Sequence, residues 1–407
     1  MSTTVSEAPV KERRGVASAR PLRVGLFGGF GIGNFGNDAS LEAVLSFLRK
    51  ERPDLELSAI CTNPAVVTQI YNLPAFSTVL RPKGIWRKLD TLLLRQPSAW
   101  ANWANCLWML GRYDVVLVCG TGVFDDFRDT PLGWPSRILR WCLAARLRGV
   151  RIAFISVGAG PILNPISRLL FKHAAQLAQH RSYRDANSRE YMQSIGVDEG
   201  NSRVLPDLAF LLPSPPMVQR PHSAALTIGV GIMNYRGWRG SDAVYADYLA
   251  AHENLIEWIE GQGHKVRILI GQTPTDLVAV RDLEARMGRP LMRPEDEALS
   301  SIHDVMRAVA ATDLVVASRY HVQIAALKMA RPLISLSYGP KNDALMELAG
   351  LKTFVQDVHR IDLGLLKDQI STLAGDRAHY GDIVRARVEA MEAELHEAMF
   401  ELDLVGE

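Results

Sequence analysis

The chain has 407 residues, of which 48% are hydrophobic and 22% charged, and its formal net charge is +2. This composition is typical of a soluble globular protein with two domains of roughly 150–200 residues each. A nearly balanced charge argues against nucleic-acid binding, and no apolar run reaches the roughly 18 residues that span a bilayer. The cysteines form no CxxC pair, so they favour a reducing cytoplasm over a zinc site or disulfides.

The first half of the chain reads as an α/β domain. Residues 1–20 are polar and basic, which predicts a flexible tail rather than a secretory signal. From residue 21 to 212, apolar runs alternate with amphipathic patterns. The predicted buried parallel strands are Leu22–Gly28, Asp114–Cys119 and Arg151–Val157, and the predicted helices are Asp38–Lys50, Ser136–Arg148 and Pro165–Gln179. This alternation predicts a doubly wound sheet.

The second half repeats the pattern after a break. Residues 213–223 are rich in proline and predict an interdomain linker. In residues 224–375 the predicted strands are Leu226–Ile232, Lys265–Ile270, Leu314–Ala317 and Leu333–Leu336, and the predicted helices are Asp242–Glu260, Asp304–Ala310 and Val322–Ala330. Residues 376–407 hold a long helical pattern, which we expect to pack back on the first domain. The sequence therefore predicts two Rossmann-like, doubly wound domains facing a cleft.

One segment between residues 85 and 110 is unusually rich in tryptophan. It contains Trp86, Trp100, Trp103 and Trp108, together with Arg87, Lys88 and Arg95. Two interpretations remain open at this point. The tryptophans either pack onto the core, or they form an interfacial amphipathic helix that contacts a membrane peripherally.

Two glycine-rich turns follow predicted strands of the first domain. In the turn over residues 28–38, the candidates for ligand or backbone contacts are Gly33, Asn34, Gly36 and Asp38. No acidic residue ends the second strand, which argues against a dinucleotide site. The loop over residues 120–126 contributes Gly120, Gly122 and Asp126. Asp126 is a candidate acceptor-side base, and the alternative for this carboxylate is a helix cap or a solvated pair.

Cationic residues follow strands of both domains. Arg184 is suited to grip a carboxylate or phosphate, and the alternative is an ion pair with Asp185 or Asp207 that ties two loops together. Arg319 and His321 stand where a buried strand ends and a helix begins. The next strand delivers Lys341 to the same edge. This part of the chain therefore supplies fixed cations and one acid/base candidate.

These segments, in this order, resemble the polysaccharide pyruvyltransferase family over roughly residues 22–352. The resemblance rests on residues 31–38, 120–126, 158–161, 184–185, 207–210, 319–321 and 338–341. It implies a glycosyltransferase-B-like fold that uses no metal or cofactor. It also implies phosphoenolpyruvate as co-substrate, bound by the second domain, and a sugar or lipid-linked oligosaccharide acceptor bound by the first.

The resemblance assigns phosphoenolpyruvate contacts and the acid to Arg319 and His321. Two loops depart from the family pattern. The usual Gly-Asp-Glu of the first turn reads Gly36-Asn37-Asp38, and the usual Gly-Gly-Gly and Gln-Asp of the second loop read Gly120-Thr121-Gly122 and Asp125-Asp126. These departures concern the acceptor side, so the acceptor sugar and its hydroxyl pair stay open.

The predicted function is transfer of the enolpyruvyl group of phosphoenolpyruvate to two hydroxyls of a surface glycan or its lipid-linked precursor. The donor-binding candidates are Arg184, Arg236, Arg319, Tyr320 and Lys341. The catalytic candidates are His321, protonated near neutral pH beside the phosphate, and Asp126. The expected location is the cytoplasm or the inner face of the membrane. The alternatives are a nucleotide-sugar glycosyltransferase of the same fold and a non-catalytic glycan-binding relative.

Overall fold

The computed structural model describes residues 20–93, 95–126, 129–216, 225–237, 240–292, 296 and 299–402. Nearly all of the predicted tail, most of the predicted linker and the last five residues lie outside this part of the chain. None of the helices in the described ranges is both long enough and apolar enough to cross a membrane.

The first half of the described chain is built around a seven-stranded sheet with the order β3-β2-β1-β4-β5-β6-β7. Its strands are β1 (Arg23–Gly28), β2 (Glu56–Cys61), β3 (Ala75–Ser77), β4 (Val115–Cys119), β5 (Arg151–Val157), β6 (His180–Tyr183) and β7 (Arg203–Val204). All neighbouring strands are parallel. Every residue of β4 is buried, as expected of a parallel strand that is covered on both faces.

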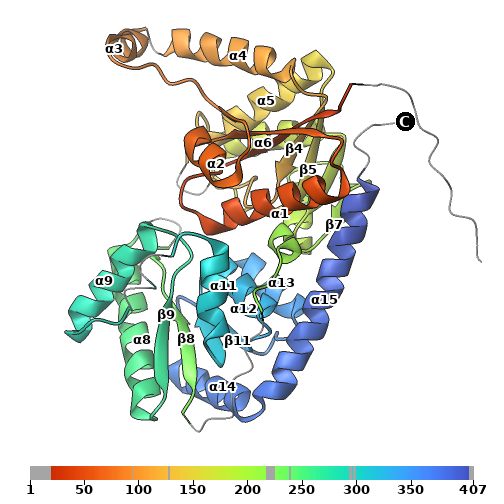
Figure 1. The fold of residues 1–407 in the computed structure, drawn as a ribbon. Coiled ribbons are helices and arrows are strands. Elements are labelled where there is room, and N and C mark those ends of the chain that lie inside the picture. The colour runs from red at the N-terminus through yellow and green to blue at the C-terminus, as the bar shows by residue number, and fades with distance from the viewer. Residues whose placement is uncertain are drawn as a thin grey trace, which may run out of the picture.

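Helices cover both faces of this sheet (Figure 1). They are α1 (Phe35–Glu51), α2 (Pro64–Tyr71), α3 (Ile85–Leu92), α4 (Gln96–Leu110), α5 (Trp134–Arg148), α6 (Pro165–Gln176), α7 (Ala186–Ser194) and the short η1 (Leu208–Leu211). Leu26 packs with residues of α1 on one face, and the neighbouring Phe27 packs with residues of α4 and α5 on the other. Because successive side chains of a strand point to opposite faces, β1 contributes to the cores on both sides of the sheet.

The second half holds a five-stranded parallel sheet with the order β12-β11-β10-β8-β9. The strands are β8 (Thr227–Gly231), β9 (Lys265–Leu269), β10 (Leu314–Ala317), β11 (Leu333–Ser337) and β12 (Val355–Asp357). The helices are α8 (Asp242–Gly261), α9 (Thr275–Met287), α11 (Ile302–Ala310), α12 (Tyr320–Lys328), α13 (Pro340–Leu348), α14 (Leu363–Gly375) and α15 (Arg377–Glu401). Two doubly wound parallel sheets confirm the predicted fold class.

Several helices start or stop a few residues from their predicted bounds, for local reasons. The first begins at Phe35 rather than Asp38, because the Asn34 side chain caps it by accepting from two backbone N–H groups. The helix predicted over Pro165–Gln179 ends at Gln176. Gln179 instead pairs with the start of β5, where its side chain accepts from Ile152 N at 2.8 Å.

The sheet orders determine where ligands fit. In the first sheet, β1 has β2 on one side and β4 on the other, and in the second sheet β8 lies between β9 and β10. Chain connections therefore leave these strands in opposite directions, which opens a crevice outside their carboxyl ends. The turn over residues 28–38 and the segment over residues 318–321 lie at these two crevices.

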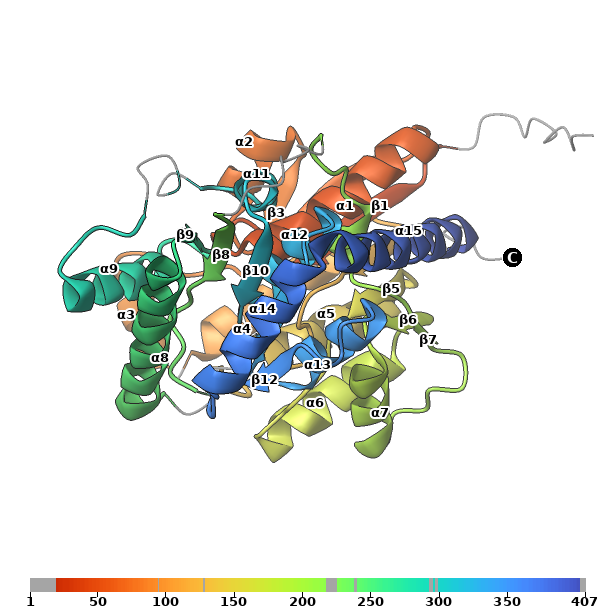
Figure 2. The same ribbon diagram turned by 90° about the horizontal axis from the view of Figure 1, so that it is seen from below.

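The two halves are joined by contacts from several elements. Lys328 of α12 donates to Phe210 O at 2.7 Å and to Glu392 of α15 at 2.6 Å. The far end of α15 reaches the first half, where Glu401 pairs with Arg203. Seen from below, α13 lies beside α7 (Figure 2), and Asn187 donates to Pro340 O at 3.2 Å.

Candidate active site

A cavity of about 540 Å³ lies between the carboxyl ends of the two sheets. The first half lines it with residues from the turn after β1, the loop after β4 and the start of α5. The second half lines it with residues after β8, β9, β10 and β11. The cavity thus occupies both crevices that the strand orders create.

The structure sorts the predicted site residues into two groups. Those that line the cavity are Asn34, Gly122, Arg184, Arg236, Arg319, Tyr320, His321 and Lys341. Those that do not line it are Gly33, Gly36, Asp38, Gly120 and Asp126.

The glycines of the first turn let the two halves approach each other. A Cβ on Gly36 would lie 2.0 Å from the ring of His321, and a Cβ on Gly33 would lie 2.4 Å from Thr273 O. Gly33 also has a positive φ of 76°, and its carbonyl accepts from Thr273 N at 3.2 Å. These glycines therefore allow close backbone packing rather than contact with a ligand.

Asp38 holds the same turn from inside. Its Oδ1 accepts from Gly31 N at 2.7 Å, and burial raises the pKa of its carboxyl above the ordinary value. The amide of Asn37 donates to Gly29 O at 3.1 Å. Asp38 thus fixes the shape of the turn, and Asn34 and Asn37 present the polar groups that line the cavity.

The geometry argues against Asp126 as a base. Its side chain is buried, and its two oxygens accept from Leu163 N and Asn164 N, both at 2.8 Å. Both oxygens therefore already have hydrogen-bond donors, and the residue does not line the cavity. Asp126 therefore tethers the chain just ahead of α6, whose cap is Asn164, so this carboxylate is neither the helix cap nor the solvated pair considered from the sequence. The neighbouring Asp125 lines the cavity instead.

The altered glycine loop carries a strained residue. Thr121, which stands where the family pattern has a glycine, has a φ of 64°, a left-handed conformation that is costly for a β-branched residue. Gly120 beside it also has a positive φ, and a Cβ there would lie 2.7 Å from Ser40 Oγ. The loop thus presents Thr121 and Gly122 to the cavity in a conformation that suits glycine.

Arg319 is held by a carboxylate that sequence reasoning missed. Asp276, which is fully buried, accepts from Arg319 Nε at 3.1 Å and pairs with its Nη2. The same carboxylate accepts from Gly271 N at 3.1 Å. Burial acts to lower the pKa of Arg319, but Asp276 raises it above the ordinary value, so the guanidinium remains charged at the cavity wall. Asp276 lies in the first turn of α9, the helix that follows β9, and this position was the one available signal for it.

Arg184 belongs to a buried cluster that also contains His321. Arg184 lies 3.5 Å from an oxygen of Asp207 and 3.7 Å from one of Asp185, so the loop-tying alternative from the sequence is correct, although Arg184 also lines the cavity. His321 Nε2 lies 3.9 Å from the same Asp207 oxygen. Among the described residues, neither His321 Nε2 nor that oxygen has a hydrogen-bond partner.

The imidazole of His321 is neutral at pH 7 in the unliganded protein. Burial, together with the nearby cations Arg184 and Lys341, lowers its pKa to about 4 against the opposing charge of Asp207. The expected protonation near neutral pH therefore requires an anion in the cavity that offsets the cations.

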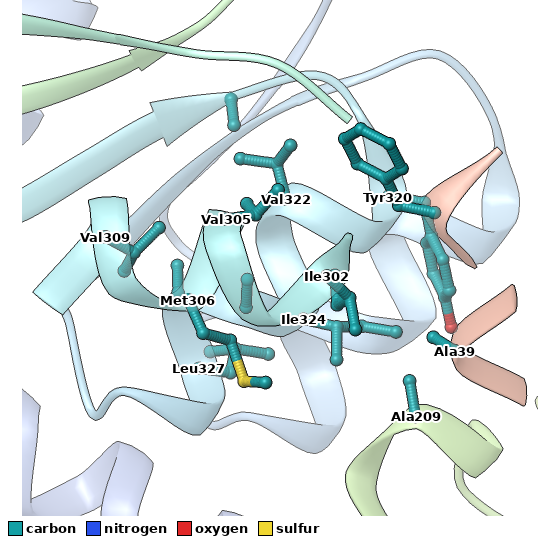
Figure 3. Close-up of a cluster of buried hydrophobic side chains, with 14 of the residues drawn as sticks. Ala39, Ala209, Ile302, Val305, Met306, Val309, Tyr320, Val322, Ile324 and Leu327 are labelled. Atoms are coloured by element: carbon teal, nitrogen blue, oxygen red, sulfur yellow. The ribbon is translucent and has the colours of Figure 1, made fainter. Parts of the chain in front are cut away.

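Two tyrosines complete this wall. The guanidinium of Arg184 lies 4.7 Å from the centre of the Tyr320 ring, and Lys341 Nζ lies 4.7 Å from that of Tyr338. Tyr320 also belongs to a buried cluster that joins α11 and α12 to Ala39 of α1 and Ala209 of η1 (Figure 3). Burial raises the pKa of Tyr338, but Lys341 and Arg319 lower it below the ordinary value.

Arg236 faces the cavity from the loop after β8. It pairs with Asp242, donates to Asn234 Oδ1 at 3.2 Å and stacks 4.2 Å over the Tyr245 ring. Together with Arg184, Arg319 and Lys341 it gives the cavity a cationic side. A small molecule with two anionic groups would be held there by charge-assisted hydrogen bonds.

Comparison with known proteins agrees with this geometry. The model of the polysaccharide pyruvyl transferase family matches residues 34–340, which is most of the chain. No curated protein matches the chain. In the described part of the chain, no group of three or more His, Cys, Asp or Glu residues is placed to hold a metal ion.

Solved structures share the fold at low sequence identity. MnaA of S. aureus bound to UDP is 14% identical with a TM-score of 0.57, over 95% of this chain and 98% of that one. HepE of Anabaena with UDP and glucose is 13% identical with a TM-score of 0.56, over 94% and 100%. UDP-GlcNAc 2-epimerase of Neisseria meningitidis bound to UDP-GlcNAc is 13% identical with a TM-score of 0.53, over 91% and 99%. The fold is thus glycosyltransferase-B-like.

Proposed function

The chain belongs to the polysaccharide pyruvyl transferase family, and we propose that it transfers the enolpyruvyl group of phosphoenolpyruvate to two hydroxyls of one sugar, forming a pyruvate ketal. The observation that carries the proposal is the pairing of a cationic cavity wall with a buried, neutral imidazole. Phosphoenolpyruvate combines a carboxylate, a phosphate and an enol that must be protonated, so it needs both features.

The donor is held by Arg319, Arg236 and Lys341, together with Arg184, which also lines the cavity. The start of α12 adds to this charge. Among the described residues no side chain caps α12, and its N-terminal residues Arg319 to His321 line the cavity. A helix N-terminus of this kind offers backbone N–H groups and a partial positive charge to an anion.

His321 acts as the general acid. Bound phosphate and carboxylate offset the cations that lower its pKa, so the imidazole takes up a proton as the donor binds. That proton passes to C3 of the enol, C2 becomes electrophilic, and the first sugar hydroxyl adds there. The bond from C2 to the phosphate oxygen then breaks, and the second hydroxyl closes the ketal. Of the two hydroxyl protons, one restores His321 and the other leaves with phosphate.

The acceptor sugar lies against the first half. Asn34, Asn37, Thr121 and Asp125 line that side of the cavity, and amide, hydroxyl and carboxylate groups suit sugar hydroxyls. Asp125 replaces Asp126 as the candidate that accepts the proton of the attacking hydroxyl. The reaction as proposed uses no metal or cofactor. We assign it to the cytoplasm, because the four cysteines are free, buried thiols.

The test is incubation of the protein with phosphoenolpyruvate and a panel of nucleotide-linked and lipid-linked sugars. We expect phosphate release together with a new ketal methyl singlet in the proton NMR spectrum of the sugar. Release of a nucleotide without a ketal would instead support a nucleotide-sugar glycosyltransferase. Specific binding of a glycan without turnover of either donor would support the non-catalytic alternative.

A further inference from the structure

Helices α3 and α4 carry an exposed apolar surface. We define the α3–α4 surface by residues whose side chains are 41–77% exposed: Ile85, Trp86, Leu89, Leu92, Leu93 and Trp100. Trp108, farther along α4, is also 61% exposed. The interpretation in which the tryptophans pack onto the core therefore holds only for Trp103, which is partly buried against the second core cluster.

Helix α3 exposes its apolar face and buries a polar residue, the reverse of an ordinary surface helix. Ile85, Leu89 and Leu92 share one face of the helix at the spacing i, i+4, i+7, and that face is open. The buried residue of this fully described helix is Asp90. Its carboxylate accepts from Ser98 N at 2.8 Å. An ordinary surface helix turns its apolar face inward, so α3 is built to present that face to something else.

A polar clamp holds this inverted helix in place. The amide of Asn102, which is buried, accepts from Leu80 N at 2.8 Å and donates to Leu80 O at 3.0 Å. It thus ties the loop before α3 to the middle of α4. Because the anchoring contacts are polar, the apolar side chains of α3 remain exposed. Figure 1 shows α3 at the periphery of the first half.

The charge around the surface has one sign. Between residues 79 and 112 the basic residues are Arg81, Lys83, Arg87, Lys88, Arg95 and Arg112, and the sole acidic residue is the buried Asp90. Exposed tryptophan and leucine ringed by Lys and Arg suit the interface of an anionic bilayer. A two-fold dimer through this surface would instead place the basic residues of two copies opposite each other.

One basic residue ahead of α3 lies near a residue of the cavity wall. Helix α3 follows the carboxyl end of β3, which is the edge of the sheet that faces the cavity. Burial lowers the pKa of Arg137, and the charges of Arg140 and Arg81 lower it further, so Arg81 lies near Arg137. Arg137 itself lines the cavity.

We infer that the α3–α4 surface docks the protein on an anionic lipid bilayer. The test is flotation of the purified protein with vesicles of phosphatidylcholine alone and of phosphatidylcholine with 30% phosphatidylglycerol, at about 0.15 M salt. The wild type floats with the anionic vesicles and stays behind with the neutral ones. Bound protein decreases as salt is raised, because the basic residues are screened.

Two variants separate the apolar and basic contributions. The double variant Arg87→Gln/Lys88→Gln lowers the partition coefficient about 25-fold, since each basic residue near an anionic surface contributes about fivefold. The variant Trp86→Ser/Leu92→Ser lowers it at least tenfold. The matched control is Ile166→Ser/Leu169→Ser on α6, whose side chains are 57% and 54% exposed, and it floats like the wild type.

Three results would overturn the inference. The wild type could stay unbound with both kinds of vesicle, or the α6 control could lose as much binding as the Trp86 variant. The protein could also run as a dimer that the Trp86 variant dissociates, which would make the surface a contact between copies. Thermal melts of each variant exclude misfolding as the cause. Vesicle binding needs no pyruvyl transfer, so failure of either proposal leaves the other standing.

Discussion

Two helices begin at the cavity, α1 from the first half and α12 from the second, and their first turns are built differently. The side chain of Asn34 accepts from Gly36 N at 3.1 Å and from Asn37 N at 3.4 Å, so α1 satisfies its own first-turn donors. Within the described chain no side chain does this for α12, which begins with Arg319 and His321 at the cavity wall.

The difference supports the proposal that the two substrates bind at opposite walls. A capped turn with neutral amides suits hydroxyl groups, whereas an uncapped turn beside fixed cations suits a small anion. The turns are nevertheless in contact, because the ring of His321 occupies the space where Gly36 lacks a side chain. His321, the proposed acid, is thus held by both halves of the molecule, between the two proposed substrate walls.

The largest effect is expected from removing the imidazole on the α12 side. His321→Gln keeps a polar side chain of similar size but cannot act as an acid near neutral pH, so kcat should fall roughly 10²–10⁴-fold. The affinity for phosphoenolpyruvate, measured by calorimetry, should change much less because the cations remain. Turnover within about threefold of the wild type would remove His321 from the mechanism.

Gly36→Ala tests the contact between the two turns. A methyl group there would lie 2.0 Å from the His321 ring, so the ring must move. Displacement by about 1 Å costs on the order of 10²-fold in rate, and we expect kcat to fall by about this factor. Alanine is the better helix former, so a loss of helix propensity cannot be the cause.

The control for this variant is Gly261→Ala at the end of α8, where an added Cβ meets nothing within 4 Å. It should leave kcat unchanged. If Gly36→Ala were as active as this control, His321 would not depend on its fit against α1.

Much of this arrangement follows from the sequence. The β-branched runs predicted the strands, and the position of Arg319 and His321 after a strand end placed them at the crevice. The predictions that failed concern residues whose partners are distant in the chain. Asp126 was proposed as a base, but the backbone just ahead of α6 donates to both of its oxygens. Asp276 was overlooked because its partner Arg319 lies 43 residues away in the chain.

A proton should be taken up when the donor binds. The pKa of His321 is about 4 in the free protein, below its ordinary value of 6.5, and donor anions raise it. At pH 7 we therefore expect up to one proton per phosphoenolpyruvate, measured by calorimetry in buffers of different ionisation enthalpy. His321→Gln should abolish this uptake, and uptake that persists unchanged would assign the proton to another group.

The same shift affects stability in the absence of donor. Between pH 6.5 and 4 the unfolded chain binds more protons than the folded one, so the free energy of unfolding falls as the pH is lowered through this window. For His321 the loss is about 3 kcal/mol. The buried His252 has a similarly lowered pKa and adds to the same slope. The free energy of unfolding, measured by urea denaturation at several pH values, should depend less steeply on pH in His321→Gln than in the wild type.

The smallest effect is expected on the capped turn, where Asn34→Ala should lower the free energy of unfolding by about 1 kcal/mol. Asn164 provides a matched control, because it caps α6 in the same way, accepting from Ile166 N at 2.8 Å and Ser167 N at 3.4 Å, and does not line the cavity. Urea denaturation should show similar losses for Asn34→Ala and Asn164→Ala.

Kinetics with varied acceptor concentration then distinguish the role of Asn34 from that of Asn164. If α1 presents Asn34 to the sugar, only Asn34→Ala should raise KM for the acceptor, by about fivefold for one lost hydrogen bond, while KM for phosphoenolpyruvate stays within twofold. Equal acceptor KM values for the two variants would limit Asn34 to capping. The division of the cavity into a hydroxyl-binding wall and an anion-binding wall would then have to rest on Asn37 and Thr121, which line it beside the same turn.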